Sequence, residues 1–82
     1  MVSDEMTIYP FTDEDKTRLD NNFTYHSPKS DQPERYVLIR DEAKQIAGTL
    51  LRVCPRSREL SVALTHLEDM VMWANASIAR NE

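Results

Sequence analysis

Aromatic rings and positively charged side chains lie close together in the first half of this chain. They belong to Tyr25, His26, Lys29, Arg35 and Arg40. Flat rings stack on nucleobases, and Lys and Arg side chains pair with phosphates, which together is how proteins hold nucleotides. This stretch therefore predicts a binding site for a small anionic ligand of the nucleotide type.

The spacing of the two arginines limits what one chain does alone. Arg35 and Arg40 are five positions apart, so on a helix their side chains diverge by more than a right angle. A single chain would not direct both of them at one phosphate. A pocket formed between subunits avoids this difficulty, because different chains then supply different parts of the site.

A second basic cluster surrounds Ser57, with Arg56 before it and Arg58 after it. A helix that begins here would offer free amides and the positive end of its dipole to an anion. Solvated arginines at a turn are an equally good interpretation. Glu59, in the first turn, would favour the helix dipole.

Signatures of catalysis and of metal binding were not found in the sequence. One glycine, Gly48, is too few for a glycine-rich phosphate loop, and there is no nucleophile elbow or HExxH helix. His26 and His66 have no second histidine or cysteine at ligand spacing. The chain is therefore expected to bind its ligand without an enzymatic step, a metal ion or a cofactor.

Charge and hydropathy exclude two further classes of function. The formal net charge of −4 disfavours binding to duplex nucleic acid, which depends on many Lys and Arg side chains. No run approaches the roughly 18 apolar residues of a membrane span, and the opening residues do not form a secretory signal. A single cysteine, Cys54, fits a reducing compartment. We therefore expect a soluble, intracellular protein.

The first 22 residues form an acidic N-terminal arm that carries a short helix. Thr12 is followed by three acidic residues, which is typical of an N-cap and a first helical turn. The pattern predicts a helix over Asp13–Asn22. Residues 23–82 then form the main domain.

Capping residues and prolines divide this domain into two long helices. Asp31 is expected to cap the first of them, with Pro33 in its first turn and Glu34 completing a capping box. Pro55 ends this helix near residue 53, and Ser57 caps the next.

Both long segments carry apolar residues at alternating spacings of three and four, the pattern of a heptad seam. The first seam is Tyr36, Ile39, Ala43, Ile46, Leu50 and Val53. The second is Leu60, Leu64, Leu67, Val71, Ala74 and Ile78. Two matched seams joined by a short turn predict an all-α fold, an antiparallel hairpin of two long helices preceded by the short one.

The seams leave other apolar residues outside a two-helix core. Met70 and Trp73 align with Ala63 and His66 as a second stripe on the last helix, which predicts contact with other copies of the chain. The alternative is that the N-terminal arm covers this stripe. Self-association also suits an 82-residue chain with no disulfide, because so small a core is marginal alone.

The order of residues in two segments resembles a known family. The segments are FTYHSPKSDQPERYVLIRDEAKQIA (23–47) and CPRSRELSVALTHLEDMVMWANASIARN (54–81). They are similar to the phage anti-CBASS cyclic-nucleotide sponges and their Thoeris anti-defence relatives. The resemblance implies a helical hairpin that forms a homohexamer in the host bacterial cytoplasm and sequesters immune messengers without cleaving them.

The resemblance also implies the ligand class and the contacts. The ligand would be a cyclic dinucleotide such as 3′,3′-cGAMP or a cyclic trinucleotide, in separate pockets in some members, whereas Thoeris relatives bind a cyclised ADP-ribose. Asn75 is either a ligand group or a hydrogen-bonding group between helices. A small helical protein-interaction module is the alternative from another class of function. The residues assigned to the ligand by position are Tyr25, His26, Lys29, Arg35, Arg40, Ser57, Arg58, Glu59 and Thr65.

Overall fold

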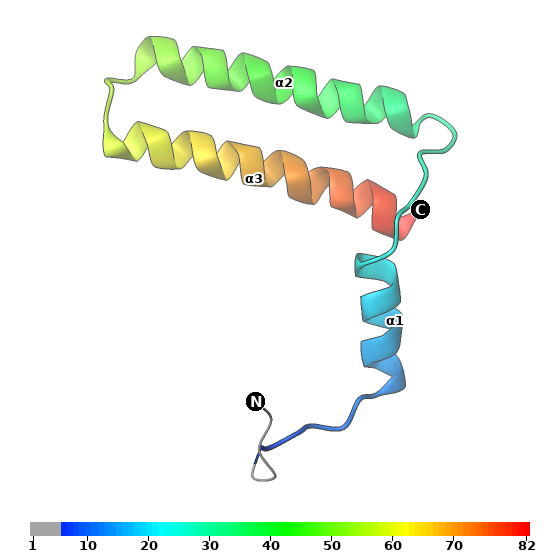
Figure 1. The fold of residues 1–82 in the computed structure, drawn as a ribbon. Helices are drawn as coiled ribbons and strands as arrows, with labels where there is room; N and C mark the ends of the chain where they lie inside the picture. The colour runs from blue at the N-terminus through cyan, green and yellow to red at the C-terminus, as the bar shows by residue number, and fades with distance from the viewer. Residues whose placement is uncertain (1–5) are drawn as a thin grey trace.

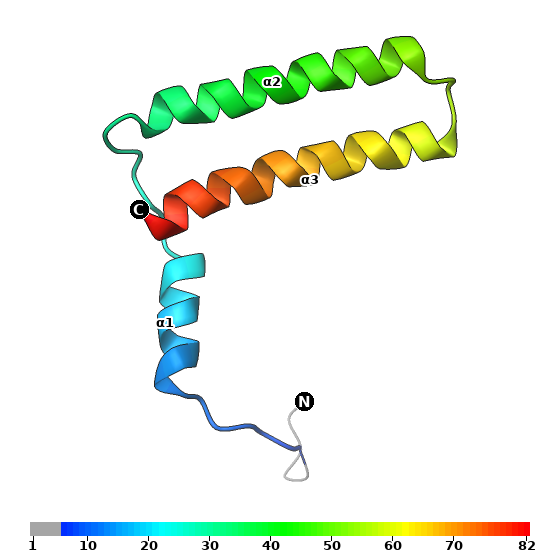
Figure 2. The same ribbon diagram turned by 180° about the vertical axis from the view of Figure 1, so that it is seen from behind.

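The computed structural model describes residues 6–82, and within this range the chain forms three helices and no strand. Their bounds are Asp13–Asn22 (α1), Gln32–Val53 (α2) and Arg58–Asn81 (α3). α2 and α3 run antiparallel as a hairpin, and α1 points away from it (Figure 1, Figure 2). We call the end with the α2–α3 turn the closed end, and the end with the start of α2 and the last turn of α3 the open end. The predicted hairpin and its preceding short helix are confirmed.

α1 begins where the sequence predicts, because two residues cap it reciprocally. The Asp15 amide donates to Thr12 Oγ1, and the Thr12 amide donates to an Asp15 carboxylate oxygen, each at 3.0 Å. The hydrogen bonds from Thr12 lower the pKa of Asp15. No residue of α1 is buried, so local polar contacts hold this helix rather than packing against the hairpin.

α2 begins at the predicted place, with Asp31 at the N-cap position, but the Asp31 side chain does not form the expected cap. Among the described residues, Asp31 makes no side-chain bond to a helix amide, because its backbone (φ −90°, ψ 11°) is not in the extended region usual for an N-cap. Its carboxylate lies 3.2 Å from Arg35 Nε instead. The side-chain cap expected from Asp31 and its capping box with Glu34 are therefore wrong, whereas the N-cap position of Asp31 and the place of Pro33 in the first turn are as predicted.

The closed end follows the local signals of the sequence. α2 ends at Val53, two residues before Pro55. Ser57 Oγ accepts a hydrogen bond from the Leu60 amide at 3.1 Å and donates one to the Pro55 carbonyl at 3.2 Å. Ser57 thus caps α3 as predicted and also fixes the turn that precedes it.

The core between α2 and α3 follows the predicted seams but is narrow. Leu60 and Ala43 are buried, with 6% and 7% of their surface exposed. Ile46 and Val53 were assigned to the first seam, yet they are 48% and 71% exposed and lie outside the core. Val53 is exposed because it is the last residue of α2, where the chain leaves the hairpin interface. The core is narrow because two helices alone cover only a strip of each other's surface.

The chain is extended for its size. Its radius of gyration is 19.0 Å, whereas a compact chain of this length has about 12 Å. Trp73, in the second apolar stripe, is 68% exposed. The alternative that the arm covers this stripe is therefore wrong for the described part of the arm. Of the helices in residues 6–82, none is long and apolar enough to cross a membrane.

Candidate ligand-binding groove

A groove of about 430 Å³ lies at the open end, between the loop that follows α1 and the two long helices. We call it the open-end groove. The loop side supplies one wall, and α2 and α3 supply the other two. It is lined by Asn22, Thr24, His26, Tyr36, Arg40, Asn75, Ala76, Ala79 and Arg80.

His26 holds the loop wall in place. Its Nε2 lies 2.7 Å from the backbone oxygen of Asn21. Because a carbonyl oxygen only accepts hydrogen bonds, Nε2 must carry a proton. In the neutral imidazole the other nitrogen, Nδ1, is then an acceptor that a ligand can use.

α2 and α3 each bring an arginine to the groove. Arg40 comes from α2 and Arg80 from the last turn of α3. Tyr36 lies one helical turn before Arg40 and shares its face of α2. Two guanidinium groups beside an aromatic ring suit a ligand that carries both phosphates and bases.

Asn75 adds a polar group without a partner. Among residues 6–82, its buried Oδ1 atom accepts no hydrogen bond. This oxygen therefore does not make the interhelical bond that the sequence allowed for. Buried polar atoms are nearly always satisfied in native proteins, so Asn75 Oδ1 is a candidate acceptor for a ligand donor.

Arg80 connects the groove to the exposed apolar stripe. Its Cζ lies 5.9 Å from the centroid of the Trp73 ring, which is within the range of a cation–π interaction. Trp73 belongs to the stripe of Ala63, His66 and Met70. A second molecule bound to this stripe would therefore lie next to one wall of the groove.

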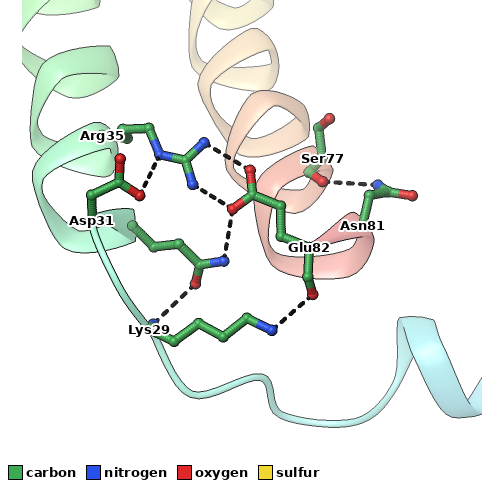
Figure 3. Close-up of polar contacts among 7 residues, drawn as sticks. Lys29, Asp31, Arg35, Ser77, Asn81 and Glu82 are labelled. Carbon is green, nitrogen blue, oxygen red and sulfur yellow. Dashed lines mark hydrogen bonds and ion pairs between the residues drawn. The ribbon is translucent and has the colours of Figure 1, made fainter.

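Lys29 and Arg35 do not line the open-end groove, because both contact Glu82 (Figure 3). Arg35 donates to both carboxylate oxygens of Glu82, with 2.7 Å between Nη1 and Oε2. Lys29 Nζ donates to the Glu82 backbone oxygen at 3.0 Å, and Gln32 Nε2 to Oε1 at 3.1 Å. Arg35 and Arg40 thus have different surroundings, as their spacing predicts.

These contacts change the acidity of the groups involved. The hydrogen bonds from Arg35 and then from Gln32 lower the pKa of Glu82 to about 2. The bond to Glu82 in turn raises the pKa of Arg35. Both groups therefore stay charged at any physiological pH.

Tyr25 is the fifth predicted residue at this end. It is not part of the groove lining, and it is 81% exposed. Its neighbours Thr24 and His26 do line the groove. Its ring is therefore accessible to a base or to a neighbouring subunit.

The other predicted contacts lie toward the closed end. Ser57, Arg58 and Glu59 are at the start of α3. Thr65 follows two turns later, with its hydroxyl bonded to the Ser61 carbonyl at 3.1 Å. At about 1.5 Å per residue, Asn75, the first α3 residue that lines the groove, lies about 24 Å along the helix from Glu59 and about 15 Å from Thr65. One chain therefore cannot bring this group into the open-end groove.

Some groove residues were not predicted as ligand contacts. Tyr36 was assigned to the first seam and is half-buried there. Arg80 lies in the last turn of α3, where a cation is usually explained by the helix dipole. Its position four residues after Ala76 places both on one face of α3. Because Ala76 was not itself predicted as a ligand contact, this spacing could not have indicated Arg80 in the sequence.

The comparison with protein families decides the identity of the fold. The model of the Acb2/Tad1 hairpin domain matches residues 15–79. The chain belongs to the Acb2/Tad1 hairpin family. This confirms the resemblance to anti-CBASS and Thoeris anti-defence sponges.

Membership of the Acb2/Tad1 hairpin family implies, in broad terms, a sponge that binds cyclic nucleotides. The match begins within α1 and ends at residue 79, so it includes all the residues of the open-end groove except Arg80. Searches of the curated proteins and of the solved structures found no match.

Proposed function

We propose that this chain is a phage-encoded sponge that binds a cyclic dinucleotide, such as 3′,3′-cGAMP, and keeps it from its receptor in CBASS-type defence. The open-end groove carries the proposal, because Arg40 and Arg80 both line it and come from two different helices. A cyclic dinucleotide has two phosphates and two bases, which suit two guanidinium groups and an aromatic ring. The sponge acts in the host bacterial cytoplasm and releases its ligand intact.

The working form in this proposal is a homo-oligomer, with a hexamer as the expected assembly. The accessible surface of the chain is 7245 Å², whereas a compact monomer of this mass exposes about 5,000 Å². The difference is of the size that obligate interfaces remove from water. In such an assembly, Ser57, Arg58, Glu59 and Thr65 either reach a neighbouring chain's groove or form a second pocket for a cyclic trinucleotide.

Calorimetry with purified protein tests the proposal directly. The panel contains 3′,3′-cGAMP, a cyclic trinucleotide and a cyclised ADP-ribose, the messenger class of Thoeris defence. We expect saturable binding of the cyclic dinucleotide, and chromatography of the heat-released ligand should show it unchanged. Absence of binding across the panel would refute the sponge.

Light scattering separates the sponge from a protein-interaction module. A ligand-independent oligomer supports the sponge. A monomer that gains stability only with a second protein supports the module.

A further inference from the structure

The Glu82 carboxylate lies in a cluster of donors that closely matches a site for an external anion. Arg35 donates to both of its oxygens, and Gln32 donates to Oε1. Lys29 adds a positive charge beside them through its bond to the Glu82 backbone oxygen. These three donors come from seven consecutive residues that span the loop and the first turn of α2 (Figure 3).

Contacts that do not involve Glu82 already orient two of the donors. Gln32 is only 3% exposed, and its Oε1 accepts from the Lys29 amide at 3.1 Å. This bond directs the Nε2 of the same side chain toward Glu82. The Asp31 carboxylate forms an ion pair with Arg35, 3.2 Å from Nε, and both terminal nitrogens of the guanidinium donate to the Glu82 carboxylate. Gln32 and Arg35 therefore have contacts besides Glu82 that position them, whereas the Lys29 ammonium is bonded to Glu82.

A phosphate would accept the same bonds. Guanidinium groups pair with carboxylates and phosphates in the same bidentate geometry. The Glu82 and Arg35 side chains keep 39% and 37% of their surface exposed. An anion from solution therefore has access to the place that Glu82 takes.

We propose that Lys29, Gln32 and Arg35 form a phosphate receptor that Glu82 occupies in the ligand-free chain, and that a ligand phosphate binds there by displacing Glu82. This inference rests on the proposed function for its natural ligand. It assigns Glu82 the role of an internal competitor. Removal of the Glu82 charge should therefore strengthen ligand binding. If Glu82 served only to stabilise the fold, its removal would not strengthen binding.

Because Glu82 competes with the ligand, only molecules in which the receptor is free can bind it. The apparent affinity is the intrinsic affinity multiplied by the fraction of such molecules. Half-exposed ion pairs are weak, so neutralising Glu82 should raise the affinity by about two- to fivefold. Glu82→Gln removes the charge with little change of shape. Glu34→Gln, at an exposed carboxylate two residues from Gln32, is the matched control for the change in net charge.

The test measures two probes, 3′,3′-cGAMP and inorganic pyrophosphate, on the full chain. We expect Glu82→Gln to bind pyrophosphate two- to fivefold more tightly than the natural chain, by the same ion-pair argument. Glu34→Gln should show a clearly smaller gain. Arg35→Ala in the Glu82→Gln background should abolish the gain.

Unchanged or weaker pyrophosphate binding by Glu82→Gln would overturn the inference. Glu82 would then have a structural role only. The second probe separates this outcome from failure of the proposed function. If the natural chain binds no 3′,3′-cGAMP, the sponge proposal fails for that messenger. The receptor still stands in that case if pyrophosphate shows the expected order of affinities.

Discussion

Arg40 is the groove residue for which a substitution is most informative. It lies in the open-end groove, and its neighbour Arg80 comes from another helix. Loss of a charge-assisted bond costs about 1.5–3 kcal/mol, so we expect Arg40→Ala to weaken 3′,3′-cGAMP binding at least about tenfold by calorimetry. Helical content by circular dichroism should not change, because Arg40 is exposed.

Arg52→Ala is the control for this substitution, since Arg52 is an exposed arginine at the closed end of α2. It removes the same charge but lies far from the groove. Equal losses for the two variants would indicate general attraction of the ligand to basic side chains rather than a defined site.

Glu82 gives the chain a specific dependence on pH. Its pKa lies well below the usual value of a glutamate, at about 2, chiefly because of the hydrogen bonds from Arg35. A carboxyl group whose pKa is lower in the folded state stabilises that state fully above its unfolded pKa and loses this effect as pH falls through its folded pKa. The contribution is therefore complete at pH above about 5 and is lost toward pH 2.

We expect the natural chain to have a higher melting temperature than Glu82→Gln at pH 6, with the two values converging as the pH falls from 5 to 2. Thermal denaturation followed by circular dichroism measures this difference. Other carboxyl groups, such as Asp15, are common to both chains and cancel in the comparison. A difference in melting temperature that stays constant over this pH range would show that the contact between Glu82 and Arg35 adds no charge-dependent stability.

At the level of helices, Ser57 determines how α3 starts. Its Oγ satisfies the Leu60 amide, and replacing such a cap by alanine typically costs about 1 kcal/mol. We expect Ser57→Ala to lower the free energy of unfolding by about this amount in urea denaturation. The resemblance also assigns Ser57 to the ligand, so the same variant is tested for 3′,3′-cGAMP binding.

Ser61→Ala is the matched control for the cap. The Ser61 hydroxyl bonds back to the Ser57 carbonyl, a bond that adds little to helix stability, so its loss should change the unfolding free energy by less than about 0.5 kcal/mol. A Ser57→Ala variant with unchanged stability and weaker ligand binding would show that Ser57 contributes mainly as a ligand contact and not as a helix cap.

For the complete chain, the extended shape and narrow core make self-association the main expectation. Met70 is 49% exposed and belongs to the apolar stripe beside Trp73. A charge placed there would lose its hydration in an interface, which is costly. We therefore expect Met70→Glu to shift the mass measured by light scattering from an oligomer toward a monomer.

Ser61→Glu is the control for this charge. Positions 61 and 70 are nine steps apart, so at about 100° per residue they lie on opposite sides of α3. The control should keep the mass of the natural chain. An oligomer of unchanged mass in Met70→Glu would place the subunit contact elsewhere.

Local signals in the sequence were sufficient for the helices and the hairpin. Thr12 and Ser57 each satisfy an amide three residues away, and Pro55 ends α2 through its own missing amide. Such effects act within one turn, so they are readable without knowledge of the fold. The order of residues was also sufficient to indicate the family, which the match over residues 15–79 confirms.

The site required contacts between distant parts of the chain. Arg35 contacts Glu82 across 47 positions, and this pairing, with the ion pair to Asp31, explains why Arg35 is not a groove residue. Arg80 lines the same groove as Arg40 only because α3 returns antiparallel along α2. Neither pairing can be recognised from a repeating pattern in the sequence. Side-chain pairing across the hairpin depends on the register and rotation of the two helices. Those are set by packing, which local propensity does not encode.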